Sequence, residues 1–275
     1  MRQTTIIAAK ELRDGLRNRW VLAITLLLAV FALTLAFLGA APTGVVKVSP
    51  LGVTIVSLSS LTVFLLPLIA LLLSYDAIVG EIDRGTMGLL LAYPVARWQV
   101  VLGKFLGHCA ILAIATVVGY GVAGLMLGLN GGGDAETWRA FAMLVATAVL
   151  LGAVFIALGY LVSATVRDCG TAGGIAIGIW LFFVLIYDMA LLGLLVATQG
   201  QGIDGSVLNW LLLANPTDAF RLFNLAGTPG VASLSGLSGL AAQVQLRPAA
   251  MAGALMLWVL VPLAGTVAVF SRRQV

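Results

Sequence analysis

The chain has 275 residues, of which 61% are apolar and only 9% charged. A soluble domain has about 45–50% apolar and about 25% charged residues, so a soluble enzyme and a nucleic-acid-binding protein are excluded, and most of the surface must face lipid. The net charge of +4 comes from 15 Lys and Arg against 11 Asp and Glu, and its meaning depends on where these residues lie relative to a membrane.

Six apolar runs are long enough to cross a bilayer as helices, which takes about 20 residues each. They lack the alternation of a transmembrane barrel, and backbone polar groups in lipid must be paired within their own segment. The predicted fold is therefore an all-α integral membrane protein, a single transmembrane domain over residues 1–275. The predicted spans are 20–38, 54–74, 100–129, 141–162, 171–197 and 249–270.

The distribution of Lys and Arg predicts the orientation. With the N-terminus inside, the inner segments contain eleven of these residues and the outer segments only four: Lys47, Arg139, Arg221 and Arg247. Because short cytoplasmic loops carry the excess of positive charge, we expect a multi-pass membrane protein with both termini in the cytoplasm.

The segment 1–19 has helical periodicity, with Ile6, Leu12 and Leu16 on one side and Arg13 and Arg17 on the other. This pattern predicts an amphipathic helix in the membrane interface. The alternative is an ordinary basic flank that only fixes the topology.

A long inner segment, 75–99, joins the second and third spans. Its polar residues surround a Gly-Thr break and precede an apolar stretch that ends at Pro94. We expect a short, rigid helix braced by charges, or, as the alternative, a solvated loop stabilised by its own charges. The residues of interest are Asp76, Glu81, Asp83, Arg84, Gly85, Thr86 and Arg97.

The outer segment, 198–248, is far longer than the about 2–8 residues that usually join two helices. It combines aromatic residues with an arginine, the types most often found as interface anchors, and Asn215-Pro216 reads as a helix start. We expect it to dock a periplasmic partner, with exposed aromatic residues; the alternative is an interfacial helix resting in the headgroups. The candidate contacts are Trp210, Asn215, Pro216, Asp218, Phe220, Arg221 and Phe223.

Asp188 is the one acidic residue well inside a predicted span. A carboxylate in the hydrocarbon is costly, so it must face a cavity or a partner. It is either an ion, proton or substrate site, which makes an ion-coupled secondary transporter the alternative function, or a carboxylate hydrogen-bonded to a neighbouring helix.

Gly170, Gly174 and Gly178 form a four-residue ridge at the start of the fifth span. Small residues allow close helix contacts in membranes, so we expect a contact face, within the chain or across a dimer. His108 and Cys109 are adjacent and point about 100° apart on a helix of 3.6 residues per turn, so no metal site is expected.

The only Gly-Lys pair, Gly103-Lys104, has Trp98 and Phe105 where a P-loop needs glycine and a hydroxyl. The chain is therefore expected to be neither an enzyme nor a cofactor-binding protein, and the energy for active transport must come from another subunit.

Residues 75–105, YDAIVGEIDRGTMGLLLAYPVARWQVVLGKF, resemble the ABC-2 type exporter permeases. In that family an acidic and basic cluster precedes Gly-Thr, a Leu-rich helix, a Pro and a Gly-Lys. The resemblance implies that 75–99 contains a coupling helix that docks on an ABC ATPase subunit, that ATP and Mg are bound by that ATPase, and that the permease is a homodimer, with the first and fifth spans as the expected contact.

Three stretches narrow the resemblance: KELRDGLRNRW at 10–20, DAIVGE at 76–81 and NPTDAFRL at 215–222. They are similar to permeases that serve copper-centre assembly of nitrous oxide reductase. This resemblance implies a location in the bacterial inner membrane. It also implies a cytoplasmic ATPase and a periplasmic protein as partners, with a sulfur compound or copper as the candidate cargo.

Overall fold

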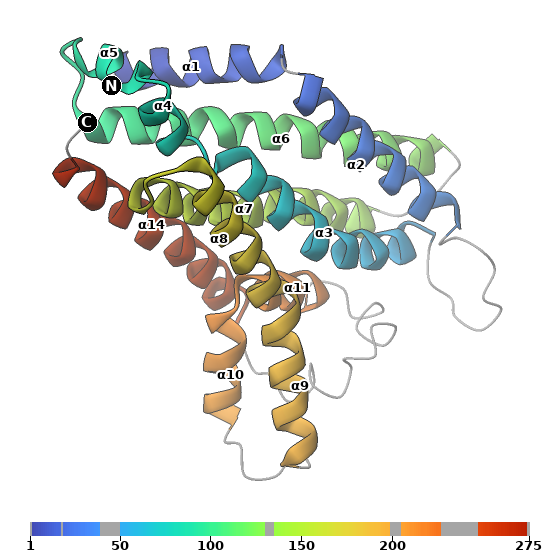
Figure 1. Ribbon diagram of the computed structural model, residues 1–275. Coiled ribbons are helices and arrows are strands. Elements are labelled where there is room, and N and C mark those ends of the chain that lie inside the picture. The colour runs from blue at the N-terminus through green and yellow to red at the C-terminus, as the bar shows by residue number, and fades with distance from the viewer. Residues whose placement is uncertain are drawn as a thin grey trace.

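The computed structural model describes residues 2–17, 19–38, 50–129, 135–198, 205–226 and 247–273. In these ranges the regular structure is entirely helical, as predicted (Figure 1). The helices, in chain order, are α1 (Arg2–Leu16), α2 (Arg19–Leu38), α3 (Pro50–Ser74), α4 (Val79–Asp83), α5 (Thr86–Leu91), α6 (Arg97–Leu129), α7 (Ala135–Thr165), α8 (Cys169–Leu181), the π-helix η1 (Phe182–Ile186), α9 (Tyr187–Ala197), α10 (Gly205–Ala214), α11 (Pro216–Ala226) and α14 (Pro248–Arg272).

Five described segments are long and apolar enough to cross a membrane. They coincide with the second to sixth predicted spans: 54–83, 97–126, 135–165, 169–197 and 248–272. The first predicted span is α2, a helix of 20 residues. Among the residues with described side chains, its apolar part is Ala23–Thr34, which is shorter than the 18 residues required of a candidate span. The count of six spans therefore stays a prediction.

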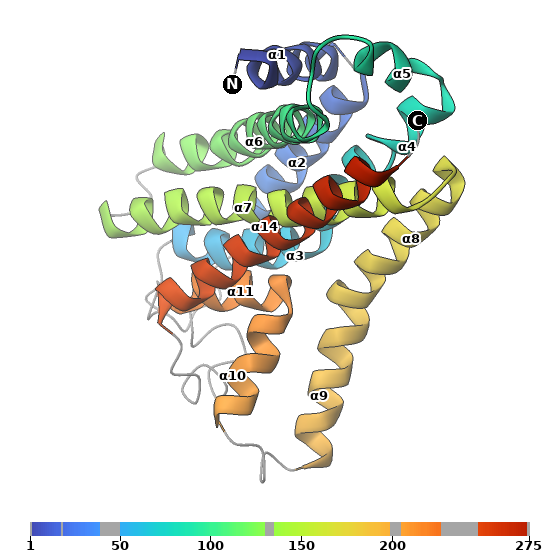
Figure 2. The same ribbon diagram turned by 90° about the vertical axis from the view of Figure 1, so that its left-hand side faces the viewer.

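The core of the bundle surrounds α7, which packs against α3, α6, α11 and α14. Of its most apolar window, 67% is buried, against only 6% for the segment 169–197. Figure 2 shows α8 and α9 at the edge of the molecule, directed away from α6 and α7. Among the described residues, few side chains of the fifth span are therefore fully buried.

Helix α1 lies along the first half of α6 (Figure 1). Glycines permit this close approach: a Cβ at Gly103 would lie 2.7 Å from Cβ of Ile7, and one at Gly107 would lie 2.5 Å from Cβ of Glu11. The predicted helix over 1–19 thus forms, and its close contact is with α6.

The two ends of the chain lie at the same end of the bundle (Figure 1), and the C-terminal end lies beside α4 (Figure 2). This placement matches an even number of crossings. Which side of the membrane this end faces stays a prediction from the charge distribution.

Candidate functional site

The inner segment 75–99 folds into two short helices, α4 and α5, separated by a sharp turn. Gly85 has φ 68°, the left-handed region that favours glycine. The backbone N–H groups of Ile78 and Val79 both donate to Oγ of Ser163 on α7, each at 3.0 Å. The start of α4 is therefore fixed to the most buried helix of the bundle, and the segment is a braced pair of helices instead of a solvated loop.

A buried ion-pair cluster joins this segment to two other helices. The ammonium of Lys104 on α6 lies 2.7 Å from Oε1 of Glu81 on α4 and 3.1 Å from Oε1 of Glu11 on α1. The Lys104 side chain is only 4% exposed. We call Lys104, Glu81 and Glu11 the inner ion cluster; it links α1, α4 and α6 through a single ammonium group.

The electrostatics of the inner ion cluster favour its charged form at Glu11. Burial acts to raise the pKa of the Glu11 carboxyl, but the ammonium groups of Lys104 and Lys10 outweigh it, and the pKa lies below its ordinary value. Lys10, at 3.1 Å, is the more exposed partner.

A second contact ties the end of the inner segment to the end of the chain. The Arg97 guanidinium donates to the carbonyl oxygen of Phe270 at 2.7 Å and also to that of Arg273. Arg273 in turn donates to the carbonyl oxygen of Ala164 at 3.0 Å. Arg97 therefore holds the C-terminal end of α14 against the start of α6, and Arg273 holds it against α7. The position of Arg97 in the sequence did not reveal this intramolecular role.

The predicted coupling residues separate into two groups. Glu81 and Arg97 point inward and brace the fold, while Asp83, Arg84, Gly85 and Thr86 are exposed and Asp76 is half-buried beside Gly80. Two exposed apolar side chains join the outward group: Leu89 is 71% exposed and Tyr93 is 70% exposed. We call Asp83, Arg84, Leu89 and Tyr93 the inner exposed surface.

At the other end, α11 begins as predicted. The Asn215 side chain accepts a hydrogen bond from the Thr217 backbone N–H at 3.1 Å, which caps the helix before Pro216. Asn215 also donates to the carbonyl oxygen of Phe183 at 3.0 Å, and the Thr217 hydroxyl donates to the same oxygen at 3.2 Å. Phe183 lies in η1, so the widened turn of the fifth span receives the start of α11.

Asp188 pairs with a neighbouring helix. Its carboxylate lies 2.9 Å from Nη2 of Arg221, and Nη1 of the same guanidinium lies 3.2 Å from the Asp218 carboxylate. Of the two interpretations of Asp188, the structure has the carboxylate bonded to a neighbouring helix. Burial, together with the neighbouring Asp188 carboxylate, raises the pKa of Asp218 to about 7, against the opposing charge of Arg221.

The expected exposure of the outer aromatic residues is wrong for Phe220. Phe220 is 0% exposed, and Asn215 and Asp218 are buried as well, because α11 is amphipathic and turns these side chains toward α3, α7 and α14. Trp210 is exposed as expected, at 74%, and Phe223 is half-buried.

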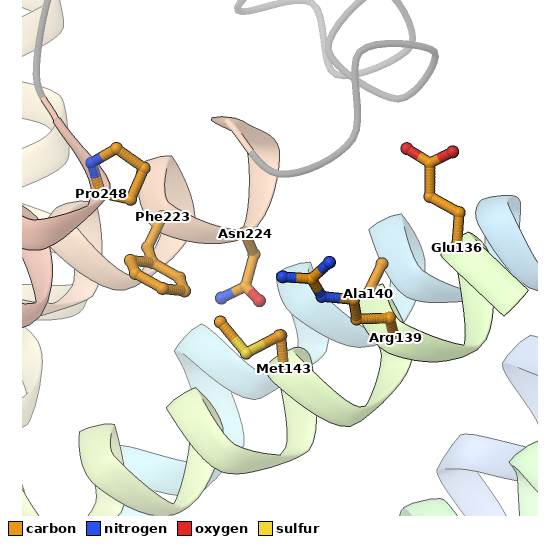
Figure 3. A pocket seen from close by; sticks show the side chains of 7 residues that line it. All are labelled: Glu136, Arg139, Ala140, Met143, Phe223, Asn224 and Pro248. Atoms are coloured by element: carbon orange, nitrogen blue, oxygen red, sulfur yellow. The ribbon is translucent and has the colours of Figure 1, made fainter.

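Phe223 also lines a cavity of about 230 Å³ (Figure 3). The cavity lies between α7 on one side and α11 with the start of α14 on the other. Its lining residues are Glu136, Arg139, Ala140, Met143, Phe223, Asn224 and Pro248.

The predicted glycine ridge makes no close contact with the described residues of its own chain. A Cβ at Gly174 or Gly178 would meet nothing within 4 Å, and one at Gly170 would meet only the Asp168 carboxylate, at 3.3 Å. Between the two alternatives for this ridge, the open surface favours a contact made by another molecule.

His108 has an internal partner: its Nδ1 lies 2.7 Å from the hydroxyl of Tyr160 on α7. Adjacent Cys109 is half-buried against the core.

The described residues form an all-helical integral membrane domain. Comparison with known protein families identifies the family to which this domain belongs. The model of the ABC-2 family transporter protein matches residues 5–275, and the chain belongs to this family. It is a multi-pass membrane permease of an ABC transporter, and membership implies an ATPase partner.

Two full-length relatives are both described as "Probable ABC transporter permease protein NosY". The one from Stutzerimonas stutzeri is 47% identical over 275 residues, 99% of each chain. The one from Pseudomonas aeruginosa is 48% identical over 271 residues, 98% of each chain. The narrower resemblance found in the sequence thus agrees with the relatives.

Proposed function

We propose that this permease supports assembly of the copper centre of nitrous oxide reductase. It does so by moving a sulfur or copper species or by transmitting ATP-driven motion to a periplasmic partner. The proposed partners are a NosF-like ATPase in the cytoplasm, which binds ATP and Mg, a NosD-like periplasmic protein and a second copy of the chain. The similarity to the two NosY permeases, together with the sequence resemblance at 10–20, 76–81 and 215–222, supports the link to the reductase. The inner ion cluster, which connects segment 75–99 to α1 and α6 through one buried ammonium, supports the transmission of motion.

The inner exposed surface is the proposed ATPase contact. Leu89 and Tyr93 supply apolar area of the kind that anchors interfaces, and Asp83 and Arg84 supply charges that select a partner and its orientation. The polar contacts behind this surface, at Glu81 and Ser163, resist local bending. A push on α5 is therefore passed to α6 and α7 instead of being absorbed by the loop.

The second copy is proposed to cover the fifth span. Only 6% of its most apolar window is buried by its own chain, and Gly174 and Gly178 offer an open ridge for close helix contact. We therefore propose a two-fold homodimer in which the first and fifth spans of the two copies are in contact.

The periplasmic partner is proposed to bind where Trp210 and Phe223 reach the surface. Arg221, which was predicted as a direct contact, instead holds α11 against Asp188. Its contribution to partner binding is therefore to position α11.

The experiment is a pull-down of the NosF-like ATPase with membranes that contain the permease variants Leu89→Asp and Tyr93→Asp. Both are expected to lose ATPase capture and ATPase stimulation while inserting normally. The control is Glu136→Gln, a change at an exposed residue near the start of α7. Wild-type capture by both aspartate variants contradicts the docking proposal.

Two further readouts separate the two forms of the function. Loss of the copper-centre absorption of the reductase in cells with the Leu89→Asp variant is expected for either form. Uptake of labelled sulfide or copper into proteoliposomes occurs only if the permease moves a cargo, and its absence in an ATPase-active complex assigns the chain a transmitting role.

A further inference from the structure

An apolar groove of about 700 Å³ runs between α10 and α14. Every side chain that lines it is apolar or a tryptophan, among them Trp210 and Leu213 of α10 and Ala250, Gly253, Ala254 and Val261 of α14. The indole N–H of Trp258, which also lines the groove, donates to the Leu213 carbonyl oxygen at 3.3 Å. A volume of this size is typical of a small-molecule site, and its lining suits a hydrocarbon.

The groove is open because its floor is made of small residues. Ala250 and Ala254 are one turn apart, and a Cβ at Gly253 would meet nothing within 4 Å. From Ala250 to Val261 the helix advances about 16 Å at 1.5 Å per residue. This length is about half of the roughly 30 Å hydrocarbon thickness, which is the depth that the acyl chains of one leaflet occupy.

A positively charged residue precedes the groove in the chain. Arg247 is exposed and immediately precedes α14. Its carbonyl oxygen accepts a hydrogen bond from the backbone N–H of Ala250 at 2.9 Å, so its backbone lies beside the Ala250 end of the groove. A guanidinium is the side chain best suited to a phosphate, because it can donate two parallel hydrogen bonds.

We propose that this groove is a phospholipid-binding site. One acyl chain lies along Ala250, Gly253 and Ala254, and Arg247 binds the phosphate of the same lipid. The lipid fills the angle between α10 and α14 and stabilises the position of α10, whose described contacts with α14 include the hydrogen bond from Trp258 to Leu213. The proposal does not depend on the cargo. It shares Trp210 with the surface proposed for the periplasmic partner, so its tests use Gly253 and Arg247, which lie outside that surface.

Tryptophan fluorescence tests the acyl chain, because Trp210 and Trp258 both line the groove. The purified permease in mild detergent is titrated with a phospholipid that carries brominated acyl chains, which quench nearby indoles. A saturable part of the quenching is expected for the unmodified chain, and loss of that part for Gly253→Leu, which fills the groove. The other four of the six tryptophans give a background common to both proteins. The matched control is Gly193→Leu on α9, where a Cβ also meets nothing within 4 Å, and it is expected to keep the quenching.

The headgroup is tested by Arg247→Gln, with Arg139→Gln, another exposed arginine at the start of a span, as its control. Loss of a charge-assisted contact is expected to weaken lipid binding about tenfold in the first variant only. Native mass spectrometry counts the retained lipid, and inorganic phosphate alone is expected neither to quench nor to bind.

Three results overturn the proposal. The first is equal quenching of Gly253→Leu and the unmodified chain. The second is retention of the lipid by both Gly253→Leu and Ala250→Phe when each variant keeps its helical circular dichroism. The third is a disulfide-linked dimer of Gly253→Cys in native membranes, because it would place a second copy in the groove.

Discussion

Replacing Lys104 by methionine is the sharpest test of the inner ion cluster. The substitution keeps the length and apolar stem of the side chain and removes only the ammonium. Glu81 and Glu11, whose oxygens lie 2.7 Å and 3.1 Å from that ammonium, then face each other without it. Leaving a buried charge unpaired destabilises a fold by about 3–5 kcal/mol. We expect the lower end of this range, because Lys10 stays 3.1 Å from Glu11.

The triple variant Lys104→Met, Glu11→Gln, Glu81→Gln separates stability from coupling. It removes the two carboxylates together with the ammonium, and apolar or neutral replacement of a whole buried ion cluster is often close to neutral for stability. Thermal unfolding in detergent should therefore show a large loss for the single variant and recovery for the triple one. If the charges transmit motion, the triple variant binds the ATPase and fails to stimulate it.

Two outcomes refute this reasoning. Unchanged thermal stability of Lys104→Met means that the three side chains do not form a buried cluster in the membrane. Full ATPase stimulation by the triple variant means that the cluster only stabilises the fold and that motion passes through other contacts, such as those of Ser163 with the start of α4.

Three further predictions concern the other surfaces. Gly174→Cys should form disulfide-linked dimers in native membranes and buried Ala176→Cys should not; equal cross-linking of both would remove the case for a dimer through this ridge. The folded state raises the pKa of Asp218 from 3.8 to about 7, so the folded protein binds this proton more tightly than the unfolded chain, and the free energy of unfolding should fall as the pH rises through that interval. Asp218→Asn should flatten this dependence on pH. An unchanged dependence would contradict the raised pKa of Asp218. Trp210→Ala with Phe223→Ala should abolish capture of the periplasmic partner and leave ATPase binding intact; retained capture would assign these aromatic residues to the membrane surface.

The apolar runs predicted the spanning helices well because length and hydropathy alone decide whether a segment can cross a bilayer. Helix α6 begins three residues before its predicted span, at Arg97, since its first turns pack on α1 and the end of α14 instead of entering lipid. The Asn215 cap was also predictable, because capping depends on neighbouring residues only.

Contacts between residues far apart in the chain could not be predicted from the sequence. The glycine spacing at 170, 174 and 178 predicted a contact face, yet the close approaches within the described chain are made at other glycines, among them Gly103 and Gly107. Both sets have the same four-residue spacing, and only the arrangement of helices decides which one finds a neighbour.

The partners of the buried charged residues could not be predicted from the sequence either. Asp188 was conspicuous as an intramembrane carboxylate, but its partner, Arg221, is 33 residues away in the sequence. Lys104 and Glu11 are 93 residues apart and carry no local signal of their pairing. A single sequence identifies a charge that needs a partner; the fold supplies the partner.

The fifth span connects the inner and outer features to the proposed dimer contact. Its first helix, α8, begins beside the coupling segment: Val79 of α4 packs with Ala172 of α8, and the Cys169 thiol donates to the Asp83 carboxylate at 3.3 Å. At its middle, η1 receives the start of α11, and beyond it Asp188 holds Arg221. We propose that a displacement of α4 acts on α7 through Ser163 and also on the fifth span, of whose most apolar window only 6% is buried among the described residues. The fifth span would then carry part of the displacement to α11.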